Sequence, residues 1–173
     1  MKLARVGVIA AAVLAVATLA WAQKTDFSGT WTLDPEASGM AGAPGGAAPG
    51  GGGAPGGGGG GRGMGGGALG QGATVKQTAD AITVERTMGD QKVTTTYKLD
   101  GTESKNSMMG RGGAAVEAVS VAKWEGPALV IVTKMDMGNG PQESTQKWTL
   151  AGTALTIETT NARGTQKMVY KKQ

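Results

Sequence analysis

The side chains that most often carry out covalent chemistry are missing from this sequence. It contains no histidine and no cysteine, which removes the commonest general base, the thiol nucleophile and most transition-metal sites. No two acids have a spacing that predicts a paired-carboxylate hydrolase. We therefore predict no catalytic residue and no enzyme activity. Turn propensity and hydration explain most of the acidic side chains, which fall at predicted turns or polar strand positions: Asp80, Asp90, Asp100, Glu125, Glu85 and Glu158.

Two short segments have residue types that bind metals. Met135-Asp136-Met137, with Met108 and Met109, offers thioethers of the kind that Cu(I) accepts, but the Met-x-Met pattern occurs once and without histidine. Asp136 to Gly140 resembles part of a calcium loop but lacks the alternating acids and the closing glutamate. Core packing and a glycine turn account for these residues, so we predict neither a metal nor a cofactor.

The first residues have the pattern of an export leader. Lys2 and Arg5 precede an apolar run that ends in the small-x-small sequence Ala20-Trp21-Ala22. This pattern predicts a secretory signal peptide over residues 1–22, cleaved after Ala22. We therefore expect a periplasmic or secreted protein without a stable membrane anchor. Loss of Lys2 and Arg5 lowers the formal charge from +4 to +2, and the remaining charges of both signs are interspersed, which indicates no nucleic-acid partner.

A glycine-rich segment covers residues 39–72. More than half of its residues are glycine, its one charge is Arg62, and it has no aromatic side chain. It buries too little apolar surface to offset its ordering entropy, so we predict disorder. The strand predicted before it, around residues 26–33, cannot fold alone and must pair with strands after it. Residues 23–173 are therefore predicted to form one domain with a disordered insertion.

The rest of the chain alternates between strand and turn signals. Its runs are rich in threonine, valine and isoleucine with a period of two, and turns such as Asp100-Gly101 separate them. No stretch has helical periodicity. We predict an all-β fold, an antiparallel meander barrel of about 8 to 10 strands. Besides 26–33, the expected strands cover residues 74–78, 82–87, 91–99, 103–109, 114–124, 129–135, 142–150, 154–160 and 165–172.

Several short motifs resemble those of a known group of barrels. Phe27-x-Gly29-Thr30-Trp31-x-Leu33 resembles the Gly-x-Trp opening strand of the lipocalins and fatty-acid-binding proteins, the calycins. Three later motifs are similar to the middle and end of fatty-acid-binding proteins: Lys98-Leu99-Asp100-Gly101, Lys123-Trp124-Glu125-Gly126 and Met168-Val169-Tyr170-Lys171. The chain thus resembles a secreted bacterial member of this group.

The resemblance implies a barrel that holds a small hydrophobic ligand. Gly29 and Trp31 would be structural, with Trp31 closing one end beneath a late basic residue, Lys171 or Lys172. Two features depart from the family. Fatty-acid-binding proteins hold a carboxylate with an arginine two residues before the closing tyrosine, where this chain has Met168. They also insert a helical pair after the first strand, where this chain has glycines.

We predict from these features that the protein binds a small apolar or amphipathic molecule without covalent chemistry. The alternative is a cell-envelope β domain without a ligand, whose interior is filled by side chains and whose role is structural or in protein interaction. An internal void would separate the two. The residues predicted to contact a ligand are Val93, Thr95, Tyr97, Leu129, Ile131, Gln146, Trp148, Leu155, Ile157 and Tyr170.

Overall fold

The computed structural model describes residues 24–40, 68–88, 91–109, 115–136, 138 and 140–173. The predicted leader, residues 1–22, lies outside these ranges, as does most of the predicted disordered segment, residues 41–67. The two ends of that segment contribute to the core. Leu69 is 0% exposed, and Met40 packs against the core from the other side. The segment predicted from composition is therefore too long at both ends, because composition does not show which single apolar residues pack into the core.

The described chain contains ten β-strands and no helix. This confirms the predicted all-β fold. The predicted start at residue 26 is too early, because residues 24–28 belong to no strand. The strands are β1 (Gly29–Leu33), β2 (Gly72–Gln77), β3 (Ala81–Met88), β4 (Gln91–Lys98), β5 (Glu103–Met109), β6 (Ala115–Glu125), β7 (Ala128–Asp136), β8 (Pro141–Ala151), β9 (Ala154–Asn161) and β10 (Gly164–Lys172).

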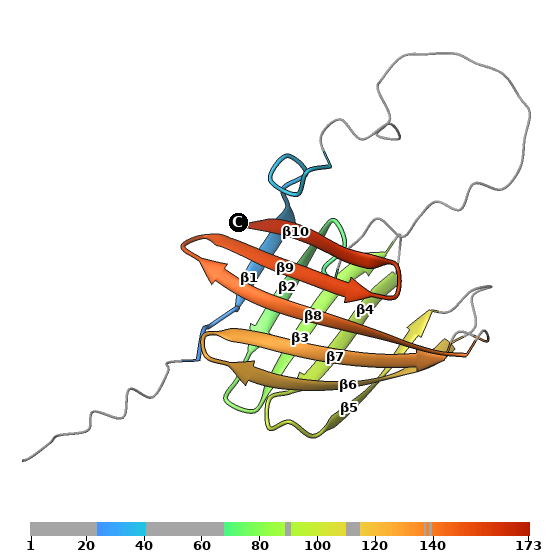
Figure 1. Ribbon diagram of the computed structural model, residues 1–173. Helices are drawn as coiled ribbons and strands as arrows, with labels where there is room; N and C mark the ends of the chain where they lie inside the picture. Colours follow the sequence, from blue (N-terminus) through green and yellow to red (C-terminus); the bar gives the residue numbers. More distant parts are fainter. Residues whose placement is uncertain (1–23, 41–67, 89–90, 110–114, 137, 139) are drawn as a thin grey trace, which may run out of the picture.

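The strands form one antiparallel sheet that curls into a nearly closed barrel. Their order is β4-β3-β2-β1-β10-β9-β8-β7-β6-β5, so every neighbour in the sheet is a neighbour in sequence except β1 and β10. In Figure 1, strands β6 to β10 cross in front of β1 to β4, and the core lies between these two walls. One-sided amphipathic strands bury their apolar faces when a sheet closes on itself.

Strand β1 joins the two walls. It pairs with β2 on one side and with β10 on the other, where Leu33 lies opposite Tyr170. Beyond β1, the carboxylate of Asp34 forms an ion pair with Lys171 at 2.8 Å and accepts a hydrogen bond from the Ala37 amide at 3.2 Å. The hydrogen bond from Lys171 is the main cause that lowers the pKa of Asp34. The exit from β1 is therefore attached to β10.

The barrel closes between β4 and β5 through side chains instead of a backbone ladder. The Asn106 amide donates to the carbonyl of Thr96 and accepts from its N–H, both at 2.9 Å, as a neighbouring backbone would. Ser104 Oγ accepts a 2.8 Å hydrogen bond from the N–H of Lys98. These contacts lie near the β4–β5 turn. We call this junction the β4–β5 seam.

Replacing Asn106 by alanine is expected to weaken the seam. It removes both hydrogen bonds to Thr96, and we expect the free energy of unfolding to fall by about 1–2 kcal/mol. Asn106→Asp keeps an acceptor for the Thr96 N–H but cannot donate to the carbonyl, so its loss should be about half as large. Urea denaturation measures both variants. Two variants as stable as the wild type would show that the seam does not depend on Asn106.

Candidate functional site

One end of the barrel is crossed by the segment Lys24–Ser28, which we call the strap. Thr25 Oγ1 donates to the carbonyl of Pro127, in the turn between β6 and β7, at 2.7 Å. At the opposite wall, the Gln77 side chain accepts from the N–H of Phe27 at 3.0 Å and donates to the carbonyl of Thr25 at 2.9 Å. The strap is thus attached to both walls, and we call this the strap end of the barrel.

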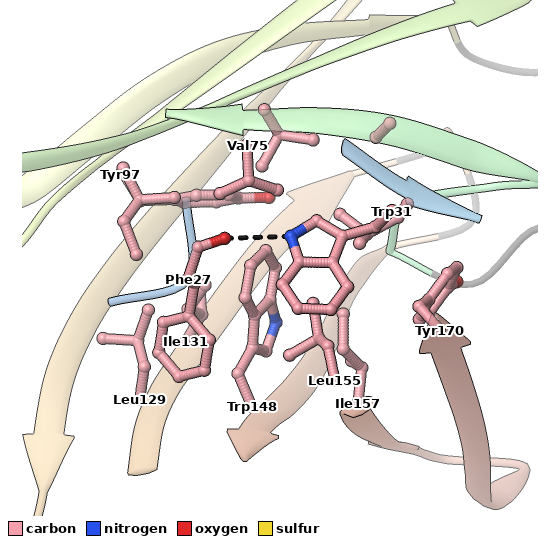
Figure 2. Packing of buried hydrophobic residues seen from close by; sticks show 14 of the residues in the cluster. Phe27, Trp31, Val75, Tyr97, Leu129, Ile131, Trp148, Leu155, Ile157 and Tyr170 are labelled. Atoms are coloured by element: carbon pink, nitrogen blue, oxygen red, sulfur yellow. Dashed lines mark hydrogen bonds between the residues drawn. The ribbon is translucent and has the colours of Figure 1, made fainter. Parts of the chain in front are cut away.

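The strap places Phe27 in the barrel interior, among three tryptophans. Its ring stacks on Trp124 with a centroid distance of 5.9 Å and meets Trp148 edge-on at 5.8 Å. The indole N–H of Trp31 donates to the carbonyl of Phe27 at 2.9 Å, the dashed line in Figure 2. Phe27, Trp31 and Trp148 are each 0% exposed. Aromatic packing therefore fills the strap end.

The Gly-x-Trp motif has a direct structural role at this end. The ammonium of Lys172 lies 5.6 Å from the centroid of the Trp31 ring, within cation–π range. Gly29 lies beneath the lysine stem: a Cβ there would approach Lys172 Cε to 2.6 Å, and the backbone φ of +148° is one that side chains rarely adopt. Of the two late lysines that the resemblance offered, Lys172 is the one over Trp31. Lys171 forms its ion pair with Asp34 instead.

Six of the ten predicted ligand contacts lie in a solid core. Their side chains are at most 1% exposed, and Figure 2 shows them packed around Trp31 and Phe27. A void that admitted water would leave exposed area on the side chains around it, so no such void adjoins these residues. A ligand would reach them only if the core opened. They are Leu129, Ile131, Trp148, Leu155, Ile157 and Tyr170.

The other four predicted contacts have different surroundings. Thr95 and Tyr97 are 5% and 6% exposed on β4. Val93, on the same strand, is half-buried. Gln146 is also half-buried, and its side-chain oxygen accepts a 3.1 Å hydrogen bond from the indole N–H of Trp148. The polar contact predicted for Gln146 is therefore already used within the protein, whereas Val93 faces inward without being fully covered.

The opposite end of the barrel, where β3, β5 and β7 finish, has a less covered inner face. We call it the loop end. Here four inward-facing apolar side chains are only half-buried, and we call them the loop-end group: Val93, Met108, Val116 and Met135. Their inward orientation follows from the register, because Met108 lies opposite Val116, and Met135 lies opposite the fully buried Ala118.

Polar side chains lie deeper on the same inner face. Ser120 and Thr133, opposite each other on β6 and β7, are 2% and 5% exposed and share a 2.9 Å hydrogen bond. Ser144, opposite Thr133 on β8, is half-buried. The inner face thus changes from aromatic at the strap end, through hydroxyls, to partly covered aliphatic and thioether groups at the loop end.

Sequence reasoning did not include Met108, Val116 and Met135 among the ligand contacts, and it also missed the inward-facing residue Arg86. It follows Ile82 and Val84 at alternate positions of β3, both of which are buried, so the period of two was the signal that could have found it. Its Nη1 donates to the carbonyl of Ala68 at 3.3 Å. In the part of the chain that the structure describes, its buried Nε has no hydrogen-bond partner.

Outside the barrel, a shallow groove of about 280 Å³ lies over β1, β2 and β3. It is open to solvent, and exposed side chains such as Thr30, Thr32 and Thr87 line it. It is not the enclosed apolar site that the sequence predicts. Within the described ranges, no three acidic side chains gather as metal ligands. The described segments also include no helix that is long and apolar enough to span a membrane.

The fold defines this chain as a nearly closed antiparallel β-barrel, and a known structure with a TM-score above 0.5 shares this architecture. A structure named REP1-NXSQ fatty acid transporter aligns over 86% of this chain and 96% of its own, with a TM-score of 0.53 and 12% identity. Secretory abundant heat soluble protein 4 from Ramazzottius varieornatus aligns over 59% of this chain and 68% of its own, with a TM-score of 0.46 and 25% identity. No protein-family model and no curated protein matches the sequence.

Proposed function

We propose that the protein is a calycin-like, extracytoplasmic binding protein that holds a small apolar or amphipathic molecule at the loop end of its barrel. The observation that carries this proposal is the loop-end group, whose four apolar side chains face inward but remain half-buried. Methionine adapts to irregular apolar shapes and is frequent at promiscuous binding surfaces. Binding is non-covalent and involves no catalytic step. The predicted leader supports the location, and sequencing the N-terminus of the exported protein, expected at Gln23, tests it.

The ligand therefore lies above the core and not within it. The six fully buried residues form the floor of the proposed site. Of the ten residues predicted to contact a ligand, Val93 is the one that belongs to the loop-end group. The structure named fatty acid transporter supports the barrel architecture of this proposal. The solid strap end favours the second candidate function, a ligandless envelope domain, because side chains already fill that half of the interior.

Binding can be measured by calorimetric titration with alcohols of 8 to 12 carbons and by native mass spectrometry of protein purified from its source. We expect one bound molecule per chain. Val93→Trp fills the loop end and should abolish binding. Thr94→Trp is the matched control, because the side chain of Thr94, the next residue in the strand, points outward and is exposed. This variant should bind the ligand normally. A folded wild type that binds no member of the panel would support the ligandless alternative.

A further inference from the structure

Arg86 is a cation on the inner face of the barrel, and among the described residues it forms no ion pair with a carboxylate. Its register partner is Val93 of the loop-end group, so Arg86 lies beside the proposed site on β3, with its Nη1 on the carbonyl of Ala68 at 3.3 Å. The adjacent acid, Glu85, points to the outer face, where it pairs with Lys76 at 2.8 Å and Lys92 at 3.0 Å. In the described part of the chain, no inward residue of β2, β4 or β10 is an acid; among these residues are Ala73, Val75, Val93, Thr95, Tyr97, Met168 and Tyr170.

Two buried phenols lie within the electrostatic reach of Arg86. Burial raises the pKa of Tyr97 and of Tyr170, and the positive charge of Arg86 opposes part of each rise. Both phenols are therefore neutral at physiological pH and do not balance the charge. The hydroxyl of Tyr170 already donates to Met168 Sδ at 3.5 Å. A partly buried charge with an unfilled donor is costly unless an anion approaches it.

We propose that Arg86 binds the anionic head group of the ligand, so that the protein prefers a singly charged amphiphile to a neutral one. This inference rests on the proposed function and narrows its ligand class. The guanidinium presents Nε and Nη donors in a fork that fits two oxygens of a carboxylate. The loop-end group, which includes the register partner of Arg86, would cover the first part of the apolar chain.

The test compares decanoate with decanol, which share the alkyl chain and differ in head-group charge, by calorimetric titration at low ionic strength. We expect the wild type to bind decanoate at least about tenfold more tightly, the typical effect of a charged hydrogen bond. Arg86→Met should lose this preference while still binding decanol, and Arg86→Lys should keep part of it. Arg163→Met is the matched control, because it removes the same charge from an exposed turn, and it should behave as the wild type.

The outcomes separate the two proposals. A wild type that binds decanol as tightly as decanoate overturns the role of Arg86 and leaves the proposed function standing, and so does an Arg86→Met variant that keeps the preference. A folded wild type that binds neither molecule overturns both. If Arg86→Met does not fold, equal binding of the two molecules by the wild type still overturns the proposal, and Arg86→Lys still tests the role of the guanidinium.

Discussion

Replacing Phe27 by alanine is expected to lower the free energy of unfolding by about 3–5 kcal/mol, because it empties the centre of the strap end. The side chain is fully buried and touches both Trp124 and Trp148. Domains of this size are typically stable by only about 5–15 kcal/mol, so the loss is a large fraction of the total. Thermal denaturation should show a melting temperature lower by roughly 10 °C or more.

The control is Phe27→Leu, which keeps most of the buried volume and should cost clearly less than alanine. Tryptophan fluorescence provides a second readout, because the truncation exposes Trp124 and Trp148 to water. An alanine variant that melts like the wild type would show that the strap is a loose tail and not part of the core.

Replacing Gly29 by alanine is expected to cost about 1–3 kcal/mol through an unfavourable backbone conformation and a displaced lysine. The new Cβ would meet Lys172 Cε at 2.6 Å, and the φ of +148° is strained for any residue other than glycine. The lysine end is flexible and can move aside, but it then leaves the Trp31 ring. Chemical denaturation of the purified variant gives the cost.

A double-mutant cycle with Lys172→Ala separates the two causes. In the Lys172→Ala background the collision and the cation–π contact are both absent, so the cost of Gly29→Ala should fall by roughly the 0.5–1 kcal/mol of that contact. The cost that remains belongs to the backbone. An unchanged stability in the single variant Gly29→Ala would remove the structural explanation given above for the Gly-x-Trp motif.

The strands and turns were predictable because each depends on local chemistry. Val93, Thr95, Tyr97 and Leu99 alternate with polar neighbours, and the structure turns them inward. In the turn that follows β4, Gly101 has a φ of +81° and Asp100 accepts from the N–H of Thr102 at 2.8 Å. Period and turn chemistry are properties of short windows, so a sequence displays them directly.

The location of the site was not predictable in the same way. Alternation shows which side chains face inward, but it does not tell a cavity wall from a packed core, so Leu129 and Val93 look alike in the sequence. What distinguishes them is the strap, which inserts Phe27 from a distant segment and fills one half only. Arg86 lies within the predicted strand 82–87, but its place on the same face as Ile82 and Val84 was not used in the prediction.

The pairing of β1 with β10 has a consequence for how quickly the protein folds. Trp31 lies opposite Lys172, so this contact joins residues about 140 positions apart, a separation that slows two-state folding. The strands from β2 to β4 and from β5 to β10 can each pair with their sequence neighbours. The barrel cannot close until β1 docks between β2 and β10. Until then β2 and β10 are edge strands with unpaired backbone groups, which are prone to aggregation. We expect the late docking of β1 to limit the rate of folding.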